Sequence, residues 1–458
     1  MEKKMSKKLW FNILLFSLMG QVAWNVENMY FNTFLYNSVY AGASQVAMDG
    51  TMPVVTAISR MVALSAVTAV ITTFIMGTLS DKLKNRKLFI SGGYVAWGFV
   101  TALFGFITRD NIAGLFGLTD EIKILTFTVW AVILMDCVMT FMGSTSNDSA
   151  FNAWVTDVTT PAVRPKVEVA FSILPVLAMG IVMGIGTFAQ TGAISYSVFF
   201  IGLGAFVMLC GVAGFFLLEE PKHRVSSEEN VNYFKSLVYG FNPSVIKKNS
   251  KFYLALVALC CSSVATQVFF PYLLTYLQYV ILPASADVQY LSVGVIVPVL
   301  ISLAVTVVEF FGLLKLVNKN KGITMFICVA VFAVTLAALS FAHDIVSVVI
   351  FALPLLPAMF IFTVHMSASI RDFTPEGKAG MFQGVRMIFV VLLPMIIGPA
   401  LGERACLNSA VEYVNEYGVT QVVPASSMFA YAAIVTACTI IPLIFLAKKG
   451  YAVESAEK

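Results

Sequence analysis

Long apolar stretches alternate with short polar segments along the whole chain. A helix needs about 20 mostly apolar residues to cross a bilayer, because the hydrocarbon core is about 30 Å thick. The pattern therefore predicts an all-α polytopic membrane protein with twelve transmembrane helices. The predicted spans are residues 10–36, 54–80, 88–108, 123–146, 167–189, 195–218, 252–280, 290–314, 323–342, 346–370, 380–402 and 427–447.

Composition supports this interpretation and excludes a soluble domain. Hydrophobic residues make up 59% of the 458 residues and charged residues only 12%, with a mean hydropathy of +0.86. Soluble proteins carry about 25% charged residues. Six of the seven cysteines fall within predicted spans, which argues against a disulfide framework.

The distribution of basic residues predicts the topology. With the amino terminus in the cytoplasm, 24 of the 29 Lys and Arg residues fall on inner segments and three on outer segments. This asymmetry follows the positive-inside rule. We therefore expect both termini in the cytoplasm of a multi-pass plasma-membrane protein, and the net charge of +4 reflects topology and not binding of nucleic acid.

A hydrophilic interval at residues 219–251 divides the chain into two predicted six-helix bundles, residues 1–218 and 252–458. Within it, apolar residues recur at helical spacing, which fits either a short interfacial helix or a partly ordered linker. The loops after the fourth and tenth spans both carry an Asp-Thr-Pro turn, at Asp157 and Asp372. This similarity indicates an internal repeat of two halves, although Asp, Thr and Pro are also common turn residues.

The first span is unusually polar. Polar side chains inside a membrane normally face a protein interior or a water-filled cavity, so this helix is predicted to belong to a functional site. At 100° per residue its amides share one stripe, while Glu27 points about 130° away. We expect the amides to face the substrate and Glu27 to pair with Arg60, and the two roles exchange if Glu27 lines the cavity. The candidate substrate residues of this helix are Gln21, Trp24, Asn25, Asn28 and Asn32.

The loop between the second and third spans carries Gly77, Asp81, Arg86 and Lys87. The loop resembles the signature of the major facilitator superfamily, in which a glycine and an aspartate precede a basic cluster. The resemblance covers nearly the whole chain and implies a transporter of two six-helix halves, with these residues acting as a cytoplasmic latch. An ordinary positive-inside loop would explain the basic residues, but not the glycine or the aspartate.

Asp136 in the fourth span, followed by an Asn/Asp-rich stretch, is similar to the sucrose-transporter branch and the related glycoside-pentoside-hexuronide:cation symporters. The resemblance implies that Asp136 takes part in proton coupling. Sodium-using members carry an Arg-x-x-Asp-x-x-x-Asp pattern in the second helix. Here Arg60 is followed by Ala63 and Val67 at those positions, so we expect H+ in preference to Na+ as the coupling ion.

Three charges of the first half are predicted at similar depth. At 1.5 Å per residue, Arg60, Glu27 and Asp136 lie about 10, 15 and 18 Å from the outer ends of their helices. One arginine leaves one carboxyl uncompensated, and burial favours the neutral form of such an acid, as proton coupling requires. The alternative is a static arrangement in which Arg60 pairs permanently with one acid.

In the second half, Glu309 and Arg386 are predicted to pair as structural or gating residues. Asp157 and Asp372, in corresponding loops of the two halves, are further gating candidates. Gln267, Tyr272 and Tyr276 of the seventh span are candidates for sugar binding, because amides suit hydroxyls and aromatic rings suit the apolar face of a sugar. Each aromatic residue could equally be a packing residue.

These features predict a proton-coupled symporter of a sugar or glycoside that works by alternating access. An exporter of drug-like or amphipathic compounds on the same fold is the alternative. The chain lacks the phosphate-binding loop of an ATP-driven pump, and its three histidines form no catalytic constellation, so we expect neither an enzyme nor a cofactor or metal. We expect a monomer surrounded by lipid.

Overall fold

The computed structural model describes residues 5–83, 85–159, 163–190, 192–220, 240–282, 301, 304–305, 308, 321–374, 379–414 and 418–451. It is built of helices, with one two-stranded ribbon of β1 (Glu412–Val414) and β2 (Thr420–Val422). The predicted all-α membrane fold is confirmed. Most of the predicted eighth span at 290–314, including Glu309, and most of the 219–251 interval lie outside the described residues.

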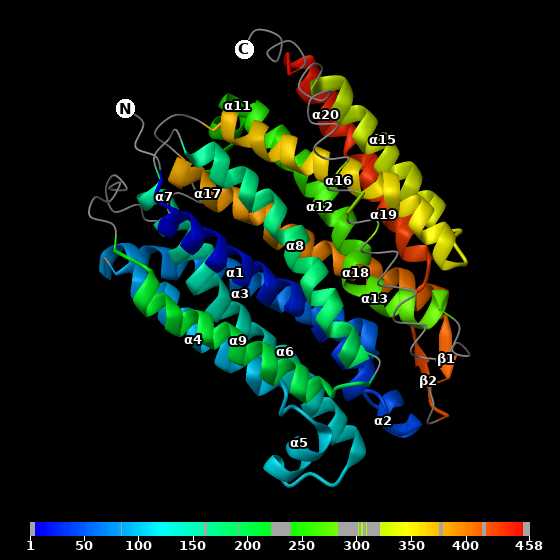
Figure 1. The fold of residues 1–458 in the computed structure, drawn as a ribbon. Helices are drawn as coiled ribbons and strands as arrows, with labels where there is room; N and C mark the ends of the chain where they lie inside the picture. The colour runs from blue at the N-terminus through cyan, green and yellow to red at the C-terminus, as the bar shows by residue number, and fades with distance from the viewer. Residues whose placement is uncertain are drawn as a thin grey trace. The chain divides into compact units, whose positions relative to one another are not determined.

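The chain forms two compact units, residues 1–226 with 414–421, and residues 227–413 with 422–458. Figure 1 shows the helices of each unit. The first unit contains α1 (Lys7–Phe34), α2 (Gln45–Asp49), α3 (Val54–Leu83), α4 (Arg86–Phe104), α5 (Arg109–Phe116), α6 (Glu121–Gly143), α7 (Asn152–Val158), α8 (Arg164–Gln190) and α9 (Tyr196–Leu217). Two π-helical segments belong to it: η1 (Leu35–Val39) extends α1, and η2 (Ser144–Phe151) joins α6 to α7.

The second unit is also built of helices with short π-helical segments between them. Its helices are α11 (Pro243–Lys248), α12 (Ser250–Phe269), α13 (Leu273–Tyr276), α15 (Lys321–Leu339), α16 (Ile345–Asp372), α17 (Ala379–Met387), α18 (Leu393–Ser409), α19 (Ser427–Cys438) and α20 (Ile440–Lys448). A 3-10 turn, η3 (Phe270–Tyr272), and the π-helical η4 (Leu277–Ile281) and η5 (Ile388–Leu392) interrupt the longer helices.

Within the described residues, ten helical stretches are long and apolar enough to cross a membrane, and Ile173–Ala189 is a shorter apolar helix. Polar residues fix where several of them begin. Ser6 caps α1, Asp120 caps α6 and Ser195 caps α9, each accepting a hydrogen bond from the first turn. Such caps satisfy amide groups that have no partner inside the helix.

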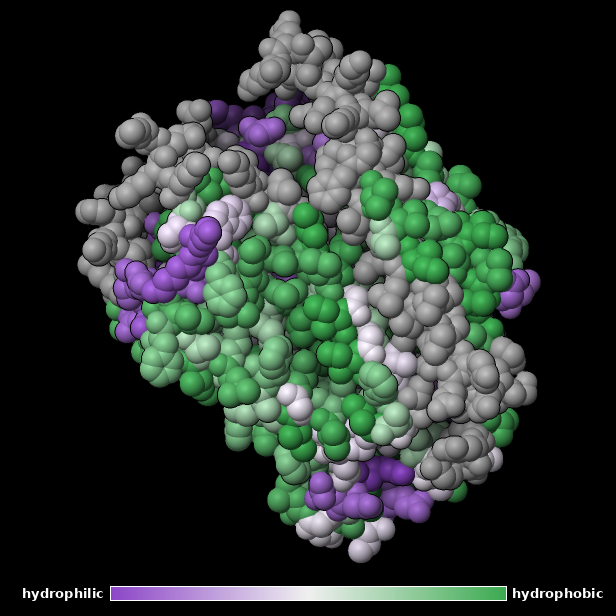
Figure 2. All heavy atoms as spheres, in the orientation of Figure 1, coloured by the Kyte–Doolittle hydropathy of each residue, from purple (hydrophilic) through white to green (hydrophobic). Residues whose placement is uncertain are grey.

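Apolar side chains cover the outside of these helices. On α3, Ile71, Ile75 and Leu79 recur every four residues and are 52%, 56% and 38% exposed. Figure 2 shows apolar residues over the middle of the visible face and hydrophilic residues toward its ends. Exposed aliphatic stripes of this kind are suited to lipid.

Helices α4 and α9 of the first unit pack against each other along much of their length and lie side by side in Figure 1. A Cβ atom added to Gly98 of α4 would lie 2.4 Å from the carbonyl oxygen of Gly204 of α9, and one added to Gly204 would lie 2.4 Å from the oxygen of Gly98. Only glycine permits this approach. Small residues allow membrane helices to pack backbone against backbone, because burial of apolar surface does not drive association in lipid.

Candidate functional site

The carboxyl group of Glu27 lies where three helices of the first unit meet. Its Oε1 accepts hydrogen bonds from Ser65 of α3 at 3.0 Å and from Thr140 of α6 at 2.9 Å, and the two hydroxyls are 2.6 Å apart. Glu27 is 7% exposed, and both hydroxyl residues are buried. The face of the first helix that carries Glu27 therefore packs into the unit and is hydrogen-bonded there.

Asp136 lies one helical turn before Thr140 on α6 and is 2% exposed. It interacts electrostatically with Glu27, and Ser65 lies beside both carboxyl groups. Asp136 Oδ1 and Glu27 Oε2 have no hydrogen-bond partner among the described residues. Two buried acids thus share one small hydroxyl cluster, and each keeps an oxygen available for a proton or a cation.

The predicted pairing of Arg60 with Glu27 is wrong. Arg60 lies on the same helix as Ser65, but its side chain is exposed, whereas Ser65 is buried against Glu27. Five residues along a helix correspond to a rotation of about 140°, so the two side chains leave α3 in different directions. No lysine or arginine neutralises the two acids in the described part of the chain.

The amides of α1 occupy the other face, as predicted. The Nδ2 atoms of Asn25, Asn28 and Asn32 donate to the backbone oxygens of Gln21, Trp24 and Asn28, one turn back, at 2.7 to 2.8 Å. These bonds fix the amides with their nitrogens toward the backbone, because a carbonyl oxygen can only accept. Gln21, Trp24, Asn25 and Asn28 stay half-buried, whereas Asn32 is 1% exposed. Asn25 Nδ2 also lies 3.5 Å from the backbone oxygen of Pro175 of α8. The amide oxygens of Asn25 and Asn28 therefore point away from the backbone of α1.

Aromatic packing holds α1 in place beside these residues. Trp24 lies 5.0 Å from Trp97 of α4 between ring centroids, and Gly143 of α6 leaves room for both rings. At Gly20, an added Cβ would lie 2.7 Å from Asn147 Oδ1 and 2.8 Å from the hydroxyl of Tyr94. The glycine that begins the polar stretch thus lets α1 approach η2 and α4 closely.

Two of the three sugar-binding candidates in the second unit are buried in its core. Tyr272 and Tyr276 are 0% and 1% exposed, and their hydroxyls donate to the backbone oxygens of Pro399 and Ala342. Their positions agree with the packing alternative and give no accessible sugar-binding surface. Gln267 is half-buried beside Gly398 of α18, where an added Cβ would lie 2.4 Å from the Cβ of Gln267.

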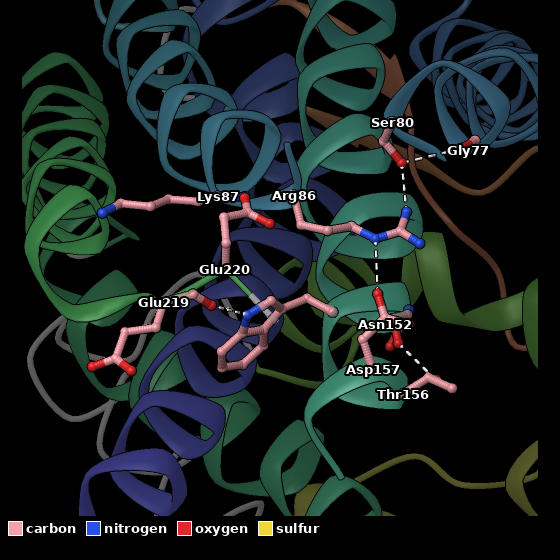
Figure 3. A network of polar contacts seen from close by, with 10 residues as sticks. Gly77, Ser80, Arg86, Lys87, Asn152, Thr156, Asp157, Glu219 and Glu220 are labelled. Atoms are coloured by element: carbon pink, nitrogen blue, oxygen red, sulfur yellow. Dashed lines mark hydrogen bonds and ion pairs between the residues drawn. The ribbon is translucent and has the colours of Figure 1, made fainter. Parts of the chain in front are cut away.

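A polar network at the start of α4 joins several latch candidates, as Figure 3 shows. Arg86 Nε lies 3.2 Å from Asp157 Oδ2, with side chains 9% and 5% exposed. Arg86 Nη1 also donates to Ser80 Oγ at 2.8 Å, and Ser80 donates to the backbone oxygen of Gly77 at 3.1 Å. A buried ion pair thus joins the start of α4 to the end of α7.

The end of α9 contributes two further acids to this network. The backbone amide of Lys87 donates to Glu220 at 2.6 Å, and Lys8 pairs with Glu219. The indole of Trp154 donates to the backbone oxygen of Glu219 at 3.0 Å. Sequence reasoning had not identified Glu219 and Glu220, although they directly follow an apolar span.

The remaining latch candidates are only partly described. The side chain of Asp81 and all of Glu309 lie outside the described residues. Asp372 ends α16 with an exposed side chain, and Arg386 is half-buried on α17. The predicted pairing of Glu309 with Arg386 therefore stays a prediction.

One family model covers most of the chain. The model of the Major Facilitator Superfamily matches residues 6–399. The chain belongs to the major facilitator superfamily. It is an integral, multi-pass membrane protein and a secondary transporter, not an enzyme. No curated protein sequence matches the chain.

Solved structures of superfamily transporters share the fold. A single-residue mutant of the nucleoside transporter NupG is 12% identical with a TM-score of 0.65, over 96% of this chain and 99% of that one. The xylose transporter XylE from E. coli is 12% identical with a TM-score of 0.63, over 96% and 97%. A bacterial homologue of the human lysosomal transporter Spinster is 12% identical with a TM-score of 0.63, over 99% of both chains.

Sequence reasoning missed the hydroxyl groups that the fold places beside the acids of this region. Ser65 and Thr140 donate to Glu27, and Ser144 donates to Asp148 of η2 at 3.1 Å. A signal was present, because Asp136, Thr140, Ser144 and Asp148 recur every four residues. This spacing places polar side chains on one helix stripe.

Proposed function

We propose that this transporter is a proton-coupled symporter of a sugar or glycoside that works by alternating access. The observation that carries the proposal is the pair of buried acids, Glu27 and Asp136. Ser65 lies beside both and Thr140 donates to Glu27, and neither acid has a basic partner among the described residues. Buried carboxyls of this kind in membrane helices commonly carry protons.

The substrate class follows from the orientation of the α1 amides. Asn25 and Asn28 are half-buried, and their nitrogens donate to the helix backbone while their oxygens point away from it. Such oxygens accept hydrogen bonds, so a ligand rich in hydroxyl donors fits this surface. The solved structures of a xylose transporter and a nucleoside transporter support the choice, since both substrates carry sugar rings.

The proposed branch is that of the glycoside-pentoside-hexuronide:cation symporters and sucrose transporters, which Asp136 suggested from the sequence. The proposed setting is the plasma membrane, with both termini in the cytoplasm and the protein acting as a monomer. Ala63 and Val67, in place of an acid pair after Arg60, support H+ in preference to Na+.

Uptake by purified protein in proteoliposomes tests this function. After a thermal-shift screen of mono- and oligosaccharides selects a ligand, we expect it to accumulate when a proton gradient is imposed. Asp136→Asn should abolish accumulation and preserve substrate exchange, because the neutral amide cannot carry a proton. Asp110→Asn, at an exposed acid of α5, is the matched control.

Three outcomes would contradict the proposal in different ways. Accumulation by Asp136→Asn would exclude Asp136 from coupling. Accumulation driven by a sodium gradient alone would replace the ion but retain symport. Extrusion of a lipophilic dye, without uptake of any sugar, would instead support the exporter.

A further inference from the structure

A stripe of polar residues begins at Asp136 on α6 and continues into η2. Asp136, Thr140, Ser144 and Asp148 follow one another at four-residue spacing, and the first three are 2%, 1% and 0% exposed. Asp148 is only partly buried. From Asp136 to Asp148 the helix advances by about 18 Å, toward the side that the basic residues assign to the cytoplasm.

Two hydroxyl groups of this stripe form hydrogen bonds to acids, one toward each end. Thr140 donates to Glu27 and lies 2.6 Å from Ser65, while Ser144, one turn further along, donates to Asp148 at 3.1 Å. Asp148 interacts electrostatically with Glu27 of α1 and Tyr94 of α4. Among the described groups that face it from neighbouring elements, these are the titratable ones, and no cation is among them.

Two further observations distinguish this stripe from an ordinary polar seam. Glu27 Oε2 and Asp136 Oδ1 are buried without a hydrogen-bond partner in the described part of the chain. The stripe also enters the eight-residue π-helical segment η2 at Ser144. π-helical turns occur frequently at functional sites, because their strained hydrogen bonding is retained only where it serves a purpose.

We propose that Asp148 is the cytoplasmic-side member of a three-carboxyl proton path, receiving the proton from Glu27 and Asp136 through the hydroxyls of Thr140 and Ser144. This assignment rests on the proposed proton-coupled function. In the step, a protonated Glu27 or Asp136 becomes a carboxylate, and the Asp148 carboxylate becomes a carboxylic acid. Between them, the Thr140 hydroxyl, a water molecule and the Ser144 hydroxyl each accept one proton and donate one, since the two hydroxyls share no hydrogen bond of their own among the described residues. Asp148 then releases the proton to water and returns to its charged form.

The test compares proton-driven uptake with substrate counterflow in the same proteoliposomes. We expect Asp148→Asn to slow proton-driven accumulation at least tenfold and to leave counterflow within twofold, because counterflow needs no net proton release. Its remaining uptake should also lose its dependence on the pH of the cytoplasmic side. Asp148→Glu, which keeps a carboxyl group, should restore most of the uptake.

Substitutions at two serines of the same segment provide a second, milder comparison. Ser144→Ala removes the donor to Asp148 and should slow proton-driven uptake several-fold, whereas Ser144→Thr should retain it. Ser146→Ala is the matched control, because Ser146 donates to the backbone oxygen of Met142 and lies off the stripe. Its uptake should equal that of the wild type.

The results separate this inference from the proposed function. Wild-type uptake driven by protons, with unchanged uptake by Asp148→Asn, would overturn the role of Asp148 alone. Equal losses of uptake and counterflow in both Asp148→Asn and Ser144→Ala would show a structural role instead. A wild type that accumulates nothing under a proton gradient would overturn the proposed function and the path together.

Discussion

At the scale of single residues, the bond from Asn28 Nδ2 to the oxygen of Trp24 decides what the amide offers a ligand. With one N–H held by the helix backbone, the half-buried side chain turns its acceptor oxygen away from α1. We expect Asn28→Ala to weaken binding of the transported sugar about fivefold, because a net hydrogen bond contributes about 1 kcal/mol. Titration calorimetry on purified protein measures the change.

A comparison with Asn152 makes this prediction specific. Asn152 forms the same kind of bond, to the backbone oxygen of Asp148 at 3.1 Å, but lies exposed on α7. Asn152→Ala should leave the affinity unchanged. Equal effects of the two substitutions would remove the α1 amides from the substrate site.

The residues also show what could be predicted from the sequence. Helical angles separated the amide stripe from Glu27, because both lie on one helix whose geometry is known. The predicted pairing of Arg60 failed because counting residues along a helix gives only how deep a side chain lies in the membrane. Which neighbour the side chain faces depends on how α3 packs against the other helices. The partners of Glu27 are hydroxyls from two other helices, and no pattern within α1 identifies them.

At the scale of elements, the contact between α4 and α9 depends on the absence of side chains. We expect Gly204→Ala to destabilise the protein by about 1 to 3 kcal/mol, because the new methyl group would overlap the backbone of α4. Its Cβ would lie 2.4 Å from the oxygen of Gly98 and 2.5 Å from the nitrogen of Ala102. Thermal unfolding in detergent measures the loss as a lower melting temperature.

Another glycine of α9 provides the matched control. An added Cβ at Gly202 meets nothing within 4 Å. Gly202→Ala should therefore be neutral or stabilising by up to about 1 kcal/mol, since alanine has a higher helix propensity than glycine. If both substitutions lowered the melting temperature equally, helix packing at Gly204 would not be the cause.

Elements were predictable to the extent that hydropathy determines them. A span must be long and apolar, so windows of about 20 residues located the membrane helices. The π-helical segments η1, η2, η4 and η5 left no such signal, because an i→i+5 turn has nearly the same composition as an α-helical one. The short β1–β2 ribbon was missed for a related reason: its two three-residue strands are too short for a pattern of alternation.

At the scale of the whole molecule, the family determines the class of function but not the substrate. A fold shared with a nucleoside transporter and a xylose transporter at 12% identity fixes a helical scaffold and little more. Function depends on side chains placed on that scaffold. The carboxyl pair, the hydroxyls around it and the α1 amides are therefore the features that experiments should change first.

Topology is the property of the whole chain that basic residues predict most directly. With both termini in the cytoplasm, α5 lies outside and α11 inside. We expect a membrane-impermeant maleimide to label Asp110→Cys but not Ser244→Cys in intact cells, and to label both after permeabilisation. Both positions are exposed at the helix surface, so accessibility depends on the side of the membrane.

The wild type provides the background for this experiment. Of its seven free cysteines only Cys438 is exposed, and it lies on the apolar α19, where lipid would shield it from an aqueous reagent. Labelling of Ser244→Cys in intact cells, with no labelling of Asp110→Cys, would show that the orientation is the reverse of the predicted one. The stripe on α6 would then lead from Asp136 to the outside, and Asp148 would exchange its proton at the opposite surface.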